Sequence, residues 1–389
     1  MNITRENKGL TPDGKWIFKP DSWCYSQTGY EDCIDILSKY DCKDFKTKYT
    51  ELEKEKIVDE LFEVYRSKNI FPINYYSDYG AEQEILDVMR RDCTLEKDGK
   101  FLPNKYNNGL DLCKYLFPAL HKTQRIDCDS MLNRFFNDKY LRVAIKLALE
   151  VNFSGKPTAV YGAMRLAGAA ATNFKPISAK TLYEHFTPKG GLIHDSSCGF
   201  GGRLFGALSS YNNYKYIGTD PNTDIQDSLH KLGNLIESVS GREEAFKIFC
   251  IGSENFKLKG IKEIADFSFT SPPYFDCEIY SDEKTQSYNK YDKGIIQWLE
   301  GFMRPTMANT YNILKPGSYY ALNVADFNRL GKTINYVDHC IRIGEQVGFK
   351  YQYKINMSVT TRIGSGFSRE EGLKRDKEKS EGVYIFKKE

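Results

Sequence analysis

The sequence predicts a mixed α/β protein: a doubly wound, Rossmann-like sheet with a terminal antiparallel strand pair, and a mostly helical N-terminal region. From about residue 190, short apolar segments alternate with amphipathic helical ones, which is typical of such a sheet. Residues 1–150 are instead charged, with apolar residues at helical spacing. The chain has 389 residues, 41% of them hydrophobic, which is enough for two domains. We therefore expect a helical region at 1–150 and an α/β domain at 151–389.

Two segments of the N-terminal region have the apolar spacing of amphipathic helices. One covers residues 51–66 and the other covers 130–150, with loops marked by proline and glycine between them. The residues expected on the buried faces are Leu52, Ile57, Val58, Leu61, Phe62 and Tyr65 in the first, and Met131, Leu132, Phe135, Phe136, Leu141, Val143, Ala144, Leu147 and Ala148 in the second.

The α/β domain is expected to contain five strands followed by an antiparallel pair. A long helix should end at Lys315-Pro316-Gly317, because proline cannot continue the helical hydrogen bonds and glycine suits a helix C-terminus. The strands are expected at 191–195, 215–220, 246–252, 265–271 and 318–325, the pair at 351–359 and 382–387, and helices at 202–210, 222–238, 294–314 and 333–347.

Composition limits the classes of protein and site. The net charge of +3 is compatible with a nucleic-acid partner but does not require one. The ten cysteines form no CxxC pair and the histidines have no metal-ligand spacing, so no metal site is expected. The N-terminus is polar, and no apolar run approaches the roughly 20 residues of a membrane helix. We expect a cytoplasmic protein, in the host cell if the chain is viral, with free thiols and no membrane partner.

Acidic and glycine residues follow the first three strands of the α/β domain. The first strand ends in Asp195-Ser196-Ser197-Cys198-Gly199-Phe200-Gly201-Gly202, where glycine lets the backbone approach a ligand. Asp220, 25 positions after Asp195, ends the second strand, and a carboxylate there can accept both hydroxyls of a ribose. The third strand ends in Ser253 and Glu254, which suit an adenine pocket.

Each of these strand ends also has an ordinary structural explanation, as a tight turn or an N-cap aspartate. All three in order favour a cofactor site, because ligands of open α/β sheets bind beyond the carboxyl ends of the strands. The residues expected to bind the cofactor there are Asp195, Ser196, Cys198, Gly199, Gly201, Asp220, Ser253 and Glu254.

The fourth strand leads into Thr270-Ser271-Pro272-Pro273-Tyr274, the most specific motif of the chain. Two prolines exclude helix and remove two N–H donors, so their carbonyls remain as acceptors without competing local donors. Ser271 adds a hydroxyl acceptor and Tyr274 a flat face that can hold a base flipped out of its stack. Two acceptors can take both hydrogens of an exocyclic amino group and aim its lone pair at a methyl donor. The alternative is a rigid surface turn; otherwise Ser271, Pro272, Pro273 and Tyr274 are the catalytic candidates.

Together these motifs resemble the S-adenosylmethionine-dependent amino-methyltransferases that act on DNA. Residues 195–202 are similar to the family's motif I, 253–254 to its third motif and 270–274 to its fourth. Asn173-Phe174-Lys175-Pro176 resembles the Lys-Pro motif that contacts the methionine end of the cofactor, which implies that Asn173 and Lys175 bind it. The resemblance covers roughly residues 170–389; Ser196 departs from it, because the family usually has proline there.

The resemblance implies methyl transfer from S-adenosylmethionine to a base amino group, with DNA as the first partner, RNA as the second, and base flipping. The Ser-Pro-Pro-Tyr form is commoner in cytosine-N4 enzymes and Asp-Pro-Pro-Tyr in adenine-N6 enzymes, so cytosine N4 is the first expected target. An adenine-N6 DNA methyltransferase is the alternative. An RNA-base or protein-glutamine N-methyltransferase, and a nucleic-acid-binding module with a relict fold, stay open.

Three further segments have expected roles around the site. Only 76 positions separate Asp195 from Ser271, which leaves no room for a recognition domain between them, so 1–150 is the candidate for target recognition. The tyrosine-bearing loop 275–288 is either a lid over the base or a mobile solvent loop. The basic stretch 362–380 is either a phosphate-contacting hairpin or a solvated charge run.

Overall fold

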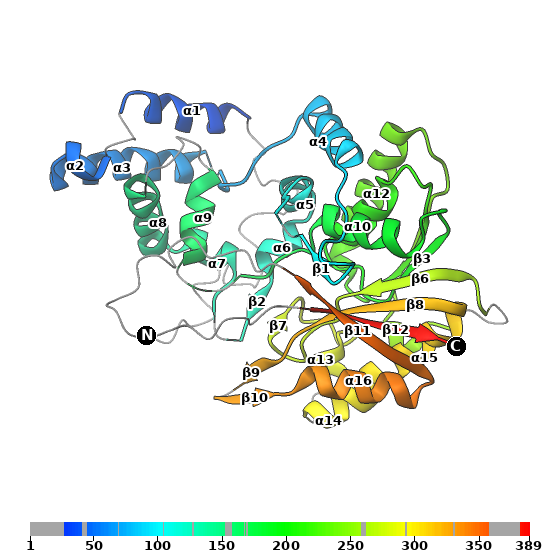
Figure 1. Ribbon diagram of the computed structural model, residues 1–389. Coiled ribbons are helices and arrows are strands. Elements are labelled where there is room, and N and C mark those ends of the chain that lie inside the picture. Colours follow the sequence, from blue (N-terminus) through cyan, green and yellow to red (C-terminus); the bar gives the residue numbers. More distant parts are fainter. Residues whose placement is uncertain are drawn as a thin grey trace. The chain divides into compact units, whose positions relative to one another are not determined.

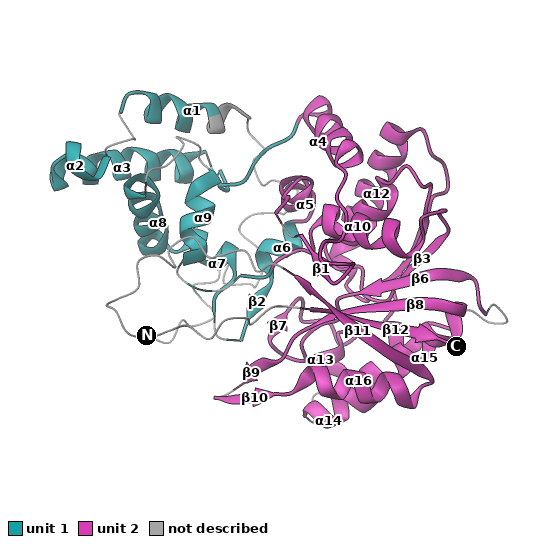
Figure 2. Ribbon diagram, in the orientation of Figure 1, with its two compact units in different colours: residues 1–76, 118–171 teal, residues 77–117, 172–389 magenta. Residues whose placement is uncertain are grey.

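The chain separates into two compact units in a computed structural model, and each unit is described by itself. Unit 1 is formed by residues 1–76 and 118–171, and unit 2 by residues 77–117 and 172–389 (Figure 2). The residues that the structure describes are 27–40, 45–68, 70–103, 105–126, 128–151, 158–166, 168, 170–257, 262–291, 294–329, 331–357 and 382–389.

This division differs from a single boundary at residue 150, because residues 77–117 belong to unit 2. Helices α4 (Asp78–Arg90) and α5 (Leu110–Leu116) pack against α12 (Gln226–Ser240) of the α/β unit. The short strand β1 (Phe101–Leu102) pairs in parallel with β11 (Phe349–Met357). Charge and apolar spacing indicate the secondary structure of residues 77–117. The unit to which they belong depends on these contacts with distant segments, which the sequence does not show. The role of 1–150 in target recognition stays a prediction.

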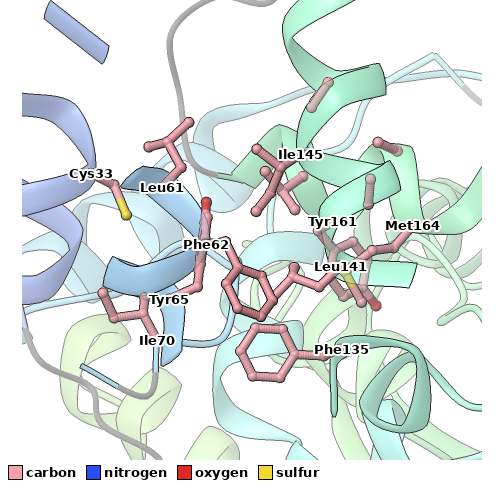
Figure 3. Close-up of a cluster of buried hydrophobic side chains, with 14 of the residues drawn as sticks. Cys33, Leu61, Phe62, Tyr65, Ile70, Phe135, Leu141, Ile145, Tyr161 and Met164 are labelled. Atoms are coloured by element: carbon pink, nitrogen blue, oxygen red, sulfur yellow. The ribbon is translucent and has the colours of Figure 1, made fainter. Parts of the chain in front are cut away.

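Unit 1 is mostly helical and has its own apolar core (Figures 1 and 3). Figure 3 shows Phe62, Leu141 and Tyr161 gathered in this core together with Phe135 and Met164. Its elements are α1 (Gln27–Ser38), α2 (Phe45–Lys48), α3 (Glu51–Ser67), α6 (Pro118–Lys122), β2 (Gln124–Arg125), α7 (Met131–Phe136), α8 (Asp138–Glu150) and α9 (Thr158–Leu166).

The helix over 51–66 is confirmed, and its N-terminus has a capping box in which Thr50 and Glu53 bond each other's backbone. The expected helix over 130–150 is instead two helices, because the Asn137 side chain accepts the N–H of Tyr140 and starts α8 afresh. Two residues expected in the core are exposed: Leu52 by 79% and Val143 by 57%. Spacing alone therefore placed the edges of both apolar faces wrongly.

Unit 2 is built on an eight-stranded mixed sheet, which confirms the expected fold class. The order is β1-β11-β12-β8-β6-β3-β4-β5, and β12 alone among these strands runs antiparallel to its neighbours. The expected antiparallel pair is thus confirmed, with β12 inserted between β8 and β11. Apart from β1 and β11, the strands are β3 (Leu192–Asp195), β4 (Lys215–Thr219), β5 (Phe246–Phe249), β6 (Ala265–Thr270), β8 (Leu314–Val324) and β12 (Gly382–Lys388).

Helices cover both faces of this sheet (Figure 1). On one face, Tyr183 packs its ring edge-on against Phe267 and Phe269 of β6. On the other, Trp298 and Met307 belong to a core that includes residues of β8. The first face carries α10 (Pro176–Phe186), α11 (Gly202–Leu208) and α12; the second carries α14 (Ile295–Trp298), the π-helical turn η6 (Leu299–Met303), α15 (Arg304–Ile313) and α16 (Tyr336–Gln346). Among the helices that the structure describes, none is long and apolar enough to cross a membrane.

The expected helix over 294–314 is interrupted, and the strand after it begins early. The π-helical turn η6 separates α14 from α15 just before Pro305, which has no N–H for the regular helical bond. Helix α15 does end just before Lys315-Pro316-Gly317, as expected, but strand β8 begins at Leu314 and includes this tripeptide. The register against β6 shifts between Ala265 and Phe267, which accommodates this stretch.

The strand order fixes where a ligand site can lie. From β3 the chain continues to β4 and β5 on one side, whereas β6 and β8 lie on the other side of β3. The carboxyl ends of β3 and β6 therefore border the crevice where the winding reverses, which is the usual ligand site of open α/β sheets.

Candidate active site at the carboxyl ends of the strands

Asp195, at the end of β3, is fully buried and surrounded by donors. One carboxylate oxygen accepts from Arg203 Nε at 2.7 Å and from the Tyr216 hydroxyl at 2.6 Å. The other accepts from the backbone N–H of Ser197 at 3.0 Å. Through these bonds to Ser197 and Arg203, Asp195 holds the glycine turn and helix α11 in place.

The glycine turn needs its glycines for conformation and for space. Gly199 and Gly201 have φ values of +54° and +76°, in the left-handed region that favours glycine. A β-carbon on Gly201 would lie 2.8 Å from a ring carbon of Phe117, whereas one on Gly199 would meet nothing closer than 3.9 Å. The backbone is therefore packed at Gly201 and open at Gly199, which is the side a ligand can approach.

Asp220, at the end of β4, lies against this open glycine. Its carboxylate accepts the N–H of Gly199 at 2.9 Å and the N–H of Asn222 at 3.1 Å. Burial raises the pKa of Asp220 to about 6, against the lowering effect of these two bonds. Each carboxylate oxygen can accept a further hydrogen bond, so Asp220 retains capacity for ribose hydroxyls. The structure thus brings the expected ribose-binding acid and the glycine turn together.

The segment before α10 is tied to the same turn. The Asn173 side chain donates to the carbonyl of Phe200 at 2.7 Å and accepts the N–H of Gly202 at 3.3 Å. Lys175 is the N-cap residue of α10, and burial lowers the pKa of its ammonium group. The two residues expected at the methionine end of the cofactor therefore flank the glycine turn, and their binding role stays a prediction.

Ser196 and Cys198 differ in what their side chains do. Among the described residues, the buried Ser196 hydroxyl has no hydrogen-bond partner. The Cys198 sulfur instead lies over Gly218 of β4, where a β-carbon would come within 2.2 Å of it. Cys198 therefore packs against the sheet, while the Ser196 hydroxyl, at the end of β3, is buried without a hydrogen-bond partner among the described residues. The unmet hydroxyl, the open Gly199 and the acceptor Asp220 fit a polar nucleoside cofactor.

Ser253 and Glu254 lie in the 3₁₀ turn η5 (Ser253–Asn255), which follows β5, and their side chains are engaged by neighbouring helices. The Ser253 hydroxyl bonds that of Thr306 at 2.8 Å. The Glu254 carboxylate pairs with Lys290 Nζ at 2.7 Å. These contacts give both residues a role in holding the turn, and their expected role in an adenine pocket stays a prediction.

The Ser-Pro-Pro-Tyr corner leaves β6 beside the tip of β3. The Ser271 hydroxyl donates to Asn323 Oδ1 at 3.3 Å. The carbonyl of Pro273 accepts the Tyr336 hydroxyl at 3.3 Å, which corrects the expectation that both proline carbonyls lack local donors. Within the described residues, no donor bonds the carbonyl of Pro272. The acceptors available at the corner are therefore the Ser271 hydroxyl and the Pro272 carbonyl.

The Tyr274 ring packs against two other aromatic rings. Phe327 meets it at 84° with centroids 5.9 Å apart, and Tyr336 meets it at 60° with centroids 5.6 Å apart. Packing against two rings at different angles fixes the plane of the Tyr274 ring.

A strained turn follows Tyr274. Phe275 has a φ of +51°, which is unusual for a bulky residue, and its buried ring packs 5.8 Å from that of Trp298. The guanidinium of Arg329, at the end of β9 (Phe327–Arg329), lies over this ring, 5.2 Å from its centroid. The same guanidinium forms a bidentate ion pair with Asp276, at 2.9 Å and 2.6 Å. Two side chains therefore clamp the unfavourable backbone directly after the catalytic candidate.

Sequence reasoning missed Asn323 and Arg329. Both follow from the expected fifth strand, since Asn323 lies near its carboxyl end and Arg329 lies a few residues beyond. The rule that placed Asp195, Asp220 and Ser271 at strand ends could have found Asn323. No sequence pattern indicates Arg329, because its pairing with Asp276 becomes visible only in the folded structure.

The loop after the corner is hydrogen-bonded to the segment that follows Asp220. The Glu283 carboxylate accepts the N–H of Thr223 at 3.3 Å and also bonds the Thr223 hydroxyl. Thr285 donates to the carbonyl of Pro221 at 3.4 Å. The Tyr280 ring lies 6.1 Å from that of Phe200 in the glycine turn. These contacts favour the interpretation of 275–288 as a lid, which stays a prediction. The basic stretch 362–380 lies outside the described residues.

Comparisons with known proteins give a distant likeness in fold. No family model matches the sequence, and no curated protein matches it. A TehB-like SAM-dependent methyltransferase from Corynebacterium glutamicum is 14% identical over 58% of this chain and 92% of that one, with a TM-score of 0.34. A SAM-dependent O-methyltransferase from Thermotoga maritima is 13% identical over 58% and 71%, with a TM-score of 0.33. A methyltransferase from Pyrococcus furiosus is 16% identical over 54% and 81%, with a TM-score of 0.34.

Proposed function

We propose that this chain is an S-adenosylmethionine-dependent methyltransferase that modifies an exocyclic amino nitrogen of a nucleic-acid base, with cytosine N4 in DNA as the first candidate. One observation carries the proposal. The glycine turn with its acidic partner and the acceptor corner leave adjacent strands, β3 and β6, on the two sides of the switch point. A cofactor at the first and an amino group at the second would face each other across one crevice.

The residues around the glycine turn would hold the cofactor. Asp220 would accept the ribose hydroxyls, the backbone at Gly199 would allow close approach, and the unmet Ser196 hydroxyl would bond a polar group. When bound, S-adenosylmethionine supplies an electrophilic methyl group on a sulfonium. The protein supplies position and excludes water, which are the main sources of rate in such a transfer.

The corner would prepare the amino nitrogen. An exocyclic amino group is a poor nucleophile, because its lone pair is delocalised into the ring. Acceptance of its two hydrogens by the Ser271 hydroxyl and the Pro272 carbonyl would favour a pyramidal nitrogen with a localised lone pair. The Tyr274 ring, fixed by Phe327 and Tyr336, would stack on the base and set its plane.

Serine at position 271 supports cytosine N4 over adenine N6 only through the family resemblance. The adenine-N6 enzyme therefore remains the second candidate, followed by an RNA-base or protein-glutamine methyltransferase, because the same corner suits any planar amino or amide group. A relict binding module would keep the cofactor contacts but transfer no methyl group.

The proposal is tested with labelled S-adenosylmethionine, DNA of varied sequence and RNA, followed by mass analysis of the nucleosides. We expect N4-methylcytosine from DNA; N6-methyladenine would move the assignment to the second candidate. Calorimetry with the cofactor alone runs in parallel. Cofactor binding without a methylated base from DNA or RNA would contradict the proposal and leave the protein-glutamine methyltransferase and the relict module.

A further inference from the structure

Asn323 is a buried amide between the acceptor corner and the reversed strand. Its side chain is 4% exposed and lies in β8, next to β6 in the sheet. The Nδ2 group donates to the carbonyl of Gly382 at 3.1 Å and lies 3.6 Å from the sulfur of Met357. Oδ1 accepts the Ser271 hydroxyl at 3.3 Å. Because only the nitrogen end of an amide can donate, the bond to Gly382 fixes which end faces Ser271.

The direction of the Ser271 proton matters for the chemistry of the corner. A serine hydroxyl has one donor hydrogen and two acceptor lone pairs, and it rotates to suit its surroundings. A hydroxyl that donated to the substrate nitrogen would occupy the lone pair that has to attack the methyl group. A hydroxyl whose proton is directed elsewhere presents only lone pairs and can accept an N–H.

We propose that Asn323 is a positioning residue that holds the Ser271 hydroxyl proton, so that Ser271 acts toward the substrate amino group as an acceptor only. The inference rests on the proposed function and deepens it, because it assigns the protonation geometry of that site. Asn323 acts through Ser271 and does not touch the substrate.

The reversed strand supplies the group that orients this amide. Gly382 is the first residue of β12 and pairs with Val324, and Val383 pairs with Asn323 itself. The carbonyl of Gly382 is therefore held by the sheet. Strand β12, the antiparallel strand of the sheet, thus prevents the Asn323 amide from flipping and presenting its N–H groups to Ser271.

A double-mutant cycle on the full-length chain tests the inference by single-turnover methyl transfer. We expect Asn323→Leu to lower the rate about tenfold while the cofactor dissociation constant stays unchanged, which is the effect of roughly one hydrogen bond. Adding Asn323→Leu to Ser271→Ala should cost nothing further. Effects that multiply would show that Asn323 supports the fold independently of Ser271 and would overturn the inference. Asn212→Leu, which removes a half-buried amide bonded to Tyr214, is the matched control and should leave the rate unchanged.

A second pair of variants keeps the inference testable if Asn323→Leu does not fold. In the Ser271→Asp variant, the ionised aspartate has no hydrogen to donate. Its carboxylate oxygens and Oδ1 of Asn323 would therefore repel each other. Asn323→Ser should therefore raise the rate when it is added to Ser271→Asp and lower it in the wild-type chain. The same direction of change in both backgrounds would overturn the inference. A wild-type chain that methylates nothing would contradict the proposed function instead, so the two failures are distinguishable.

Discussion

The two sides of the crevice are built differently. On the β3 and β4 side, the Asp195 carboxylate receives three donors, and the glycine turn is packed so tightly at Gly201 and Gly202 that a β-carbon there would clash. On the β6 and β8 side, Ser271 and Tyr274 are only partly buried, and acceptors are left available next to a strained turn. The first side has the properties of a rigid scaffold, and the second those of a surface that meets a changing partner.

The largest effect is expected from breaking the scaffold at Asp195. Asp195→Ala would leave the buried Arg203 without its partner, and we expect a loss of about 3–5 kcal/mol in the free energy of unfolding. Chemical denaturation followed by circular dichroism measures it. The double variant Asp195→Leu with Arg203→Met should recover much of this stability; if it does not, the ion pair is not the cause.

On the acceptor side, removal of the stacking face should separate turnover from cofactor binding. We expect Tyr274→Ala to lower turnover by about 10- to 100-fold, corresponding to roughly 1–3 kcal/mol of stacking, with cofactor affinity nearly unchanged. Tyr274→Phe retains the ring and should keep most of the activity. Equal loss of turnover and cofactor affinity in Tyr274→Ala would indicate a structural role instead.

The pH dependence of cofactor binding should report Asp220. Its pKa is raised by burial to about 6, and the ribose hydroxyls of the proposed cofactor would donate to the ionised carboxylate. Affinity should therefore be flat well above pH 6, reach about half of that plateau near pH 6, and fall about tenfold per pH unit well below it, as protonation removes the acceptor. Calorimetry from pH 4.5 to 8, in steps of about half a unit, measures this dependence. Asp220→Asn should bind more weakly with no such dependence, and an unchanged profile in that variant would assign the titration to another group.

The smallest effect is expected at the clamp on the strained turn. Arg329→Lys would lose the bidentate geometry with Asp276, and a partly exposed pair of this kind is worth about 1 kcal/mol, or roughly fivefold in turnover. Steady-state kinetics should show the loss in kcat, while the cofactor dissociation constant stays the same. A change confined to thermal stability would mean that the clamp serves the fold and not Tyr274.

The sequence allowed much of the scaffold side to be predicted. Glycines and acids at the ends of apolar segments follow rules that act over a few residues, and the turn with Asp195, Gly199 and Asp220 is assembled as those rules imply. Ser253 could be placed at a strand end, but its bond to Thr306 could not be foreseen. Periodicity predicts roughly which segments form strands or helices, while the partner of a side chain depends on contacts between distant segments.

The acceptor side shows the same limit more strongly. The rigid corner at 271–274 was evident from two adjacent prolines. Its supports, Asn323 and Arg329, lie about fifty residues further along the chain and become neighbours only when β8 and β9 are in place. The position of residues 77–117 in unit 2 could not be foreseen for the same reason, because their charged helical texture is that of unit 1.

The order of the segments along the chain has a practical consequence for protein engineering. The chain passes between the units at residues 76–77, 117–118 and 171–172, so the helical unit consists of two pieces with a piece of unit 2 between them. A simple N-terminal truncation at residue 150 would also remove β1, α4 and α5 from the sheet-containing unit. A chimera designed to test whether the helical unit sets target preference must exchange both pieces together and leave 77–117 native.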